Sequence, residues 1–395
     1  MENTATNPQI NDASTLLIKY ADNGAIILEK LRDAITSPSK TKRLRTWGIE
    51  AAAKMIDRSG PTLKRLEAEH PDLIPLRDDA GRRAYSLELI NRYRRYAGSL
   101  YQRPSGTRAI VCAVTNFKGG AGKTTTAVHL AQKCALTGLR VLAIDLDPQA
   151  TMTLMFGVIP DLDLEAEDTI ASVLVQNPAD LPSVIRKTYF TGVDLVPANL
   201  CLQDAELQLA NVDENNQTAL GLHAVERLRA AISAVEDQYD VVVLDCGPNM
   251  GTFTLNAVYA ATGLLVPIPP AMPDFGSARQ FFQSMGQLLA RPSFMKSLDF
   301  LKVLITRHTG TSEAADVEAL IRVNFKESVM HAVTVETVEI ERASNDFGGV
   351  YESERSRGSK EAFARAITSL DSANEELLEV FRATWARQSL SSVGR

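Results

Sequence analysis

The segment FKGGAGKT, residues 117–124, limits what this chain can fold into more than any other stretch. It follows an apolar run at 109–115 and precedes a stretch typical of a helix that begins near Lys123. Glycines let the backbone approach an anion closely. A helix N-terminus adds N–H groups that point at the same anion. The order strand, glycine loop, helix therefore predicts a phosphate-binding loop in an α/β protein.

The two lysines of the loop have different expected uses. Lys123 can reach the β- and γ-phosphates, and the Thr124 hydroxyl can bind Mg²⁺. Phe117 stands where the ordinary P-loop has glycine, and a simple phosphate cradle does not require Lys118. A dinucleotide site would instead need G-x-G-x-x-G without a loop lysine. We therefore expect ATP and Mg²⁺ as cofactors. The expected nucleotide contacts are Lys118, Gly119, Gly120, Ala121, Gly122, Lys123, Thr124 and Thr125, with Pro269 bordering the adenine.

Apolar runs alternate with helical stretches after residue 109. Nearly continuous Val/Ile/Leu strands of this kind predict a mostly parallel sheet that is covered by helices on both faces. Ligands of such sheets bind at the carboxyl ends of the strands. The expected strands are 109–115, 140–145, 193–196, 240–245, 263–268 and 300–305. The expected helices are 123–137, 220–236, 252–261, 276–290, 312–324 and 359–386.

Three aspartates follow these strands and are candidates for metal and phosphate chemistry. Asp245 ends an apolar run, so we expect it at the sheet edge, where it would hold Mg²⁺ through water. Asp145 and Asp147 are two residues apart and would point to one side of a continuing strand. The metal residues expected from this pattern are Thr124 and Asp245. A role as a turn cap remains open for Asp147, because Pro148 follows it.

The front of the chain differs in charge from the rest. Residues 40–108 carry 16 Lys/Arg and 8 Asp/Glu, although the whole chain has a formal net charge of −6. A basic segment attached to an acidic body is typical of a module that binds a polyanion. Residues 12–36 form one amphipathic helix that would pack on a second copy or on the body. The expected domains are 1–39, 40–106 and an ATPase domain at 107–395.

The basic segment has the pattern of a helix-turn-helix. A short helix at 47–56, a turn, and a second helix with Pro61 in its first turn predict this motif. The second helix would enter the DNA major groove, and a β-turn at 77–86 would form a wing. A helical linker with surface arginines is the alternative. The expected DNA contacts of this module are Thr62, Lys64, Arg65, Arg82 and Arg83.

These motifs resemble those of a known family. The spelling KGGxGKT resembles the deviant Walker A motif of the ParA/MinD ATPases. Residues 141–150 (VLAIDLDPQA) are similar to its second motif, and 241–245 (VVVLD) to its Walker B strand. Residues 187–190 and 193–199 resemble the longer plasmid partition proteins, especially the RepA proteins of repABC replicons. The basic segment resembles a MerR-type winged helix.

The resemblance implies a P-loop ATPase that partitions plasmids. It makes Lys118, Lys123 and Asp147 the expected catalytic residues. Lys118 would reach the nucleotide of a second subunit, with contact to its own nucleotide alone as the alternative. Asp147 would orient the attacking water, and Asp145 would be a metal residue that supports the magnesium shell. Dimerisation would then depend on ATP. A ParB- or RepB-type centromere-binding protein would stimulate slow hydrolysis, and an operator would be a second DNA target. A basic surface with Arg355, Arg357 and Lys360 would bind DNA without sequence preference.

Two other functions remain open from the sequence. A MinD-like membrane-positioning ATPase would need a basic amphipathic helix at a terminus, but 375–388 contains several glutamates. A MerR-like transcription factor would sense nucleotide without turnover. No apolar run reaches the ~18 residues of a membrane span, and the N-terminus lacks signal-peptide character. We therefore expect a cytoplasmic, nucleoid-associated protein that does not bind membranes, with its four cysteines as free thiols.

Overall fold

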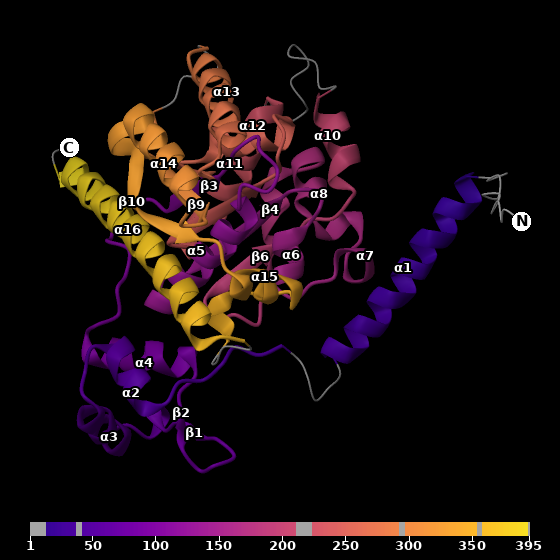
Figure 1. The fold of residues 1–395 in the computed structure, drawn as a ribbon. Coiled ribbons are helices and arrows are strands. Elements are labelled where there is room, and N and C mark those ends of the chain that lie inside the picture. Colours follow the sequence, from indigo (N-terminus) through magenta and orange to yellow (C-terminus); the bar gives the residue numbers. More distant parts are fainter. Residues whose placement is uncertain (1–12, 37–41, 211–222, 292–296, 354–357, 394–395) are drawn as a thin grey trace, which may run out of the picture.

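An eight-stranded, mostly parallel sheet forms the centre of the chain (Figure 1). The computed structural model describes residues 13–36, 42–210, 223–291, 297–353 and 358–393. The strand order is β10-β9-β8-β3-β7-β4-β6-β5, and β5 pairs antiparallel with β6. The mostly parallel α/β sheet and the helical N-terminal region predicted from the sequence are thereby confirmed, whereas the winged helix-turn-helix stays a prediction. The strands are β3 Ile110–Val114, β4 Val141–Leu146, β5 Arg186–Lys187, β6 Val193–Val196, β7 Val241–Cys246, β8 Gly263–Ile268, β9 Phe300–His308 and β10 Val329–Val335.

Helices cover both faces of this sheet, because alternate side chains of each buried strand point to opposite sides. In β3, Ile110 and Cys112 pack in a cluster with α5 and α16, whereas Val111 and Ala113 pack in a cluster with α8, α10 and α12. The helices are α5 Lys123–Thr137, α6 Thr151–Met155, α7 Pro160–Asp163, α8 Ile170–Val175, α9 Leu181–Val184, α10 Leu202–Ala210, α11 Arg227–Ser233, α12 Thr252–Ala260, α13 Met272–Leu289, α14 Ser312–Phe325, α15 Val338–Asn345 and α16 Lys360–Val393.

Several elements begin and end within a few residues of their predicted bounds, whereas β5, α6 to α10 and α15 were not predicted. Helix α5 has the predicted bounds. Of the single helix predicted at 220–236, only Arg227–Ser233 is α-helix among the described residues, and 3₁₀ turns precede and follow it. Residues 220–222 lie outside the described residues. Strand β10 was not predicted, although it pairs in parallel with β9 at the sheet edge. Only Val329, Met330 and Thr334 are buried in it and His331 is exposed, so it lacks the continuous buried apolar run of the central strands.

The first helix stands away from the sheet in Figure 1. This helix, α1, spans Ala13–Thr36. Its apolar side chains Leu17, Ile18, Tyr20 and Ile26 are exposed. The sheet and its helices therefore leave these side chains uncovered, and contact with a second copy stays a prediction.

The basic segment folds into three helices and a hairpin. Helix α2 (Ile49–Ile56) ends at Asp57, which has a left-handed backbone. Ser59 then caps α3 (Gly60–Glu69) by accepting a hydrogen bond from the Thr62 N–H group. The antiparallel strands β1 (Leu76–Arg77) and β2 (Arg83–Ala84) precede α4 (Leu87–Ala97). This element order agrees with the predicted pattern, while DNA binding by it and the predicted domain limits stay predictions.

A half-buried lysine attaches the start of the basic segment to the ATPase-like body. Lys42 Nζ lies 3.0 Å from Glu352 Oε2, donates a hydrogen bond to the Met155 carbonyl, and lies over the Tyr189 ring. Glu352 Oε1 in turn accepts a hydrogen bond of 2.7 Å from Gln132 of α5. We call Lys42, Gln132, Tyr189 and Glu352 the Lys42 cluster. It joins the basic segment to the helix that begins at the glycine loop.

Candidate nucleotide-binding site

The glycine loop has the conformation that anion binding requires. Gly120 and Gly122 have φ angles of 76° and 83°, which residues with side chains rarely adopt. Helix α5 begins at Lys123 without a side-chain cap, so its first N–H groups remain available to a ligand. Lys123 is buried, and its ammonium donates a 2.9 Å hydrogen bond to the Lys118 carbonyl. Burial lowers the pKa of Lys123, and the Asp245 carboxylate opposes that effect.

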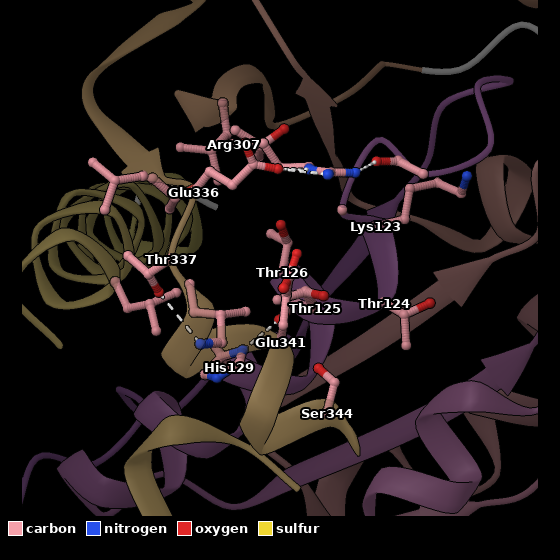
Figure 2. A pocket seen from close by; sticks show the side chains of 18 of the residues that line it. Lys123, Thr124, Thr125, Thr126, His129, Arg307, Glu336, Thr337, Glu341 and Ser344 are labelled. Carbon is pink, nitrogen blue, oxygen red and sulfur yellow. Dashed lines mark hydrogen bonds and ion pairs between the residues drawn. The ribbon is translucent and has the colours of Figure 1, made fainter. Parts of the chain in front are cut away.

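A cavity of about 490 Å³ opens beside this loop. One wall consists of the loop and α5, and the other consists of the ends of β9 and β10 together with α15 and α16. Figure 2 shows Arg307 and Glu336 at the top of this cavity, and His129 and Ser344 at the bottom. The loop residues expected to bind phosphate thus adjoin a space large enough for a nucleotide.

Asp145 and Asp245 are buried side by side at the carboxyl ends of adjacent strands. Asp145 accepts hydrogen bonds from the Thr153 hydroxyl, the Thr153 N–H group and the Asp147 N–H group. Neither oxygen of Asp245 meets a donor at hydrogen-bonding geometry among the described residues. Burial and the Asp145 charge raise the pKa of Asp245 well above its ordinary value, while the Thr124 side chain lowers it.

Asp147 lies at the wall of the cavity. One of its carboxylate oxygens accepts a 3.0 Å hydrogen bond from the Gln149 N–H group, so the aspartate also closes the turn that contains Pro148. Pro248, in the loop after β7, lines the same cavity. A side chain at Gly247 would stand 3.7 Å from the Asp147 carboxylate. The two loops that follow β4 and β7 therefore meet at Asp147.

A second cavity of about 290 Å³ lies on another side of the loop. It contains Lys118, Pro269, Asp274 and Arg307. Burial raises the pKa of Asp274, whereas Lys118 and Arg307 lower it. Lys118 thus lines the second cavity, whereas Lys123 lines the larger one. Pro269 lines this second cavity and not the larger one, and its contact with adenine stays a prediction.

The sequence did not single out the wall opposite the loop. Thr306 and Arg307 lie near the end of β9, and Glu336 and Thr337 follow β10. Thr306 Oγ1 donates a 2.9 Å hydrogen bond to the Ala121 carbonyl. The strand predicted at 300–305 offered a signal, because polar residues after a parallel strand face the ligand edge.

The residues expected to contact DNA are distributed over the basic segment. Lys64 and Arg65 are exposed on α3, and Thr62 is half-buried near the Ser59 cap. Arg82 is exposed and lies 2.8 Å from Asp78. The guanidinium of Arg83 is 2.9 Å from Glu67 of α3, so it ties the hairpin to that helix. Lys360 is exposed at the start of α16. Arg355 and Arg357 lie outside the described residues.

The residues present fit a magnesium-bound phosphate chain. An unpartnered, buried carboxylate is costly unless a cation or donor meets it. Asp245 is such a group, and Thr124, which can supply a hydroxyl ligand, lies close to it. Lys123, the loop N–H groups and the start of α5 offer positive charge and donors for the phosphates. The arrangement can hold the phosphates and place the metal beside them.

Comparison with known sequences places these features in a family. A family model described as an AAA domain matches residues 109–292. A candidate replication protein A of Sinorhizobium fredii is 35% identical over 372 residues, which are 90% of each chain. Protein SopA of Escherichia coli K12 is 32% identical and covers 83% of this chain and 85% of its own.

Solved structures share the fold. A structure named Partition Protein covers 92% of this chain and 99% of its own, with a TM-score of 0.67 and 21% identity. A cobyrinic acid a,c-diamide synthase from Mycobacterium smegmatis, with bound ATP analogue and magnesium, covers 60% of this chain and 91% of its own, with a TM-score of 0.50 and 26% identity. The glycine loop, the paired strand-end aspartates and the near full-length relatives together show that this chain belongs to the ParA-type family of plasmid partition ATPases.

Proposed function

We propose that this protein binds and hydrolyses ATP with Mg²⁺ and thereby partitions a plasmid or similar replicon. The observation that carries the proposal is the unpartnered Asp245 carboxylate next to Thr124 at a lysine-containing glycine loop. The related synthase that holds an ATP analogue and magnesium supports the choice of cofactors. Bound magnesium would offset charge on the β- and γ-phosphates during phosphoryl transfer.

Different residues bind the phosphates, hold the metal and orient the attacking water. Lys123 and the N–H groups of the loop hold the phosphates, and Asp245 and Thr124 hold the metal. Asp145 holds the loop after β4 in place through the Asp147 N–H group and Thr153. Asp147 then orients the attacking water near the γ-phosphate.

Lys118 acts on the nucleotide of a second subunit in this proposal. It lies in the second cavity, on a different side of the loop from the main cavity. A lysine supplied by a partner would stabilise the transition-state charge in the manner of an arginine finger. Two facing triphosphates repel each other, and crossed lysines would offset that repulsion. Dimerisation would then require ATP.

DNA binding has two forms in this proposal. The dimer binds nucleoid DNA without sequence preference in the cytoplasm, with Lys360 and its neighbours contributing phosphate contacts. The basic segment binds an operator, with exposed Lys64 and Arg65 at the major groove, and represses the protein's own operon. A ParB- or RepB-type centromere-binding protein stimulates the slow turnover.

Two variants test the proposal, one that should lose nucleotide binding and one that should lose only ATP hydrolysis. Lys123→Ala should abolish nucleotide binding, whereas Asp147→Ala should retain binding and lose turnover. Phosphate release and plasmid retention are measured for both variants, and both properties should fall. Normal retention of the plasmid with either variant would contradict the proposed function.

A membrane-positioning function has less support from the geometry. Within the described residues, no helix is long and apolar enough to cross a bilayer. Leu377, Phe381 and Trp385 of α16 are buried against the sheet, so they are not available to insert into lipid. Flotation of the ATP-loaded protein with liposomes would separate the two functions. Phosphate release with and without DNA separates the ATPase from a MerR-like sensor without turnover.

A further inference from the structure

We infer that Thr306 and Arg307 are positioning residues that hold the glycine loop in its anion-binding form. The inference rests on the proposed nucleotide function and names residues for it that the sequence motifs do not include. Both residues stand at the end of β9, which is separated from β3 by β8 in the sheet. The loop after β3 therefore reaches across the end of β8 to meet them.

Two successive carbonyls of the loop are hydrogen-bonded by two successive residues of β9. Thr306 Oγ1 donates to the Ala121 carbonyl at 2.9 Å, and Arg307 Nη1 donates to the Gly120 carbonyl at 3.1 Å. In a trans peptide the C=O and N–H groups point in opposite directions. Fixing these two carbonyls toward β9 thus turns the N–H groups of Ala121 and Gly122 away from it. Successive N–H groups held in this way form an anion-binding concavity.

Thr306 packs directly beside the glycine loop. Thr306 is buried, and a side chain at Gly122 would stand 3.8 Å from its Cβ and Oγ1 atoms. Because the Ala121 residue is itself buried, its carbonyl would lose its partner if the Thr306 hydroxyl were removed. An unpartnered buried carbonyl is costly. The loop would then rotate toward another donor and lose its alignment.

Arg307 is fixed by a second contact. Its Nε and Nη2 atoms lie 3.1 and 2.6 Å from Glu336 Oε1, at the end of β10 (Figure 2). Its φ angle of 53° is unusual for a residue with a side chain, and such conformations persist where surrounding contacts impose them. Glu336 also offsets the charge of the guanidinium. These contacts hold the Arg307 guanidinium at the Gly120 carbonyl. Arg307 therefore affects phosphate binding indirectly, by fixing the conformation of the loop.

Matched substitutions of Thr306 test the inference. Thr306→Val keeps the shape and removes the hydroxyl, whereas Thr306→Ser keeps the hydroxyl and removes the methyl group. We expect Thr306→Val to weaken the binding of Mg·ADP, measured by calorimetry on the full chain, by about tenfold. Thr306→Ser should remain within about twofold of the wild type, because the donor is retained. The unfolding midpoint of each protein without nucleotide is measured in parallel.

Arg307 provides an independent variant, since its side chain is half exposed. Arg307→Gln should weaken Mg·ADP binding about fivefold even if Thr306→Val fails to fold. Folded Thr306→Val and Arg307→Gln proteins with wild-type affinity would overturn the inference, whatever their unfolding midpoints. A wild-type protein that binds no Mg·ADP would instead overturn the proposed function, and this inference with it.

Discussion

Asp145 and Asp245 are register partners on β4 and β7, yet only Asp145 has hydrogen-bond donors among the described residues. Two carboxylates this close and this deeply buried cannot both be charged without compensation. Asp145 obtains that compensation from Thr153 and from the Asp147 N–H group. Asp245 lacks such donors, which supports the proposal that Asp245 holds the metal while Asp145 positions the loop after β4.

Asp245→Asn should remove most of the effect of magnesium on nucleotide affinity. The substitution keeps the size of the side chain and removes the charge that the metal requires. The ratio of the ADP dissociation constants without and with Mg²⁺ should fall from a large wild-type value to about one. Asp237→Asn, at an exposed position before β7, is the control and should keep the wild-type ratio. An Asp245→Asn protein with a wild-type ratio would refute this assignment of the metal.

His129 should make the protein less stable in mild acid. Its ring contacts the Thr125 carbonyl and accepts a hydrogen bond from the Val350 N–H group. Burial lowers the pKa of His129 in the folded chain. Below about pH 6.5 the imidazole is therefore protonated in the unfolded chain but stays neutral in the folded chain. The free energy of unfolding therefore falls as the pH falls from 7.5 to 5.5.

Substitution of His129 should reduce the change in the free energy of unfolding with pH. His129→Gln retains a donor and an acceptor and has no proton to gain, so urea unfolding between pH 7.5 and 5.5 should show a smaller loss. The control is His331→Gln, since His331 is exposed on β10. Equal pH dependence of wild type and His129→Gln would show that this ring does not control acid stability.

Lys42→Ala should destabilise the fold strongly. The substitution leaves Glu352 buried without its cation and removes the contact with the Tyr189 ring. Because the two side chains are 21% and 12% exposed, the loss should cost about 2 kcal/mol in the free energy of unfolding, which is less than for a fully buried pair. Lys187→Ala is the matched control, because Lys187 is 87% exposed in its pair with Asp194 and should cost less than about 1 kcal/mol. Similar unfolding midpoints for both variants would contradict the role given to the Lys42 cluster.

The parts of the site that lie in continuous motifs were predictable. The glycine loop, α5 and the strands that end near Asp145 and Asp245 carry strong local patterns. Continuous apolar runs predicted the central strands because those strands are buried on both faces. Edge strand β10 lacks that signal, since it is partly exposed.

The spacing of residues in the sequence could not predict that Thr306, Arg307 and Glu336 form a wall of the cavity. These residues reach the loop only because β9 lies two strands from β3 in the sheet, across β8. Neighbour order in a parallel sheet depends on tertiary packing and not on local propensity. The Lys42 cluster was missed for the same reason, because Lys42 and Glu352 are 310 positions apart in the chain.

The most direct test of the account mixes two inactive proteins. Lys118→Ala has an intact site and cannot supply the crossing lysine, whereas Asp147→Ala binds ATP and keeps Lys118 but cannot orient the attacking water. Phosphate release is measured with DNA for each variant and for an equal mixture. If Lys118 acts across the dimer, the mixture should recover up to about a quarter of wild-type turnover, because half of the dimers contain one complete site of two. A mixture no more active than its separate components would contradict the account.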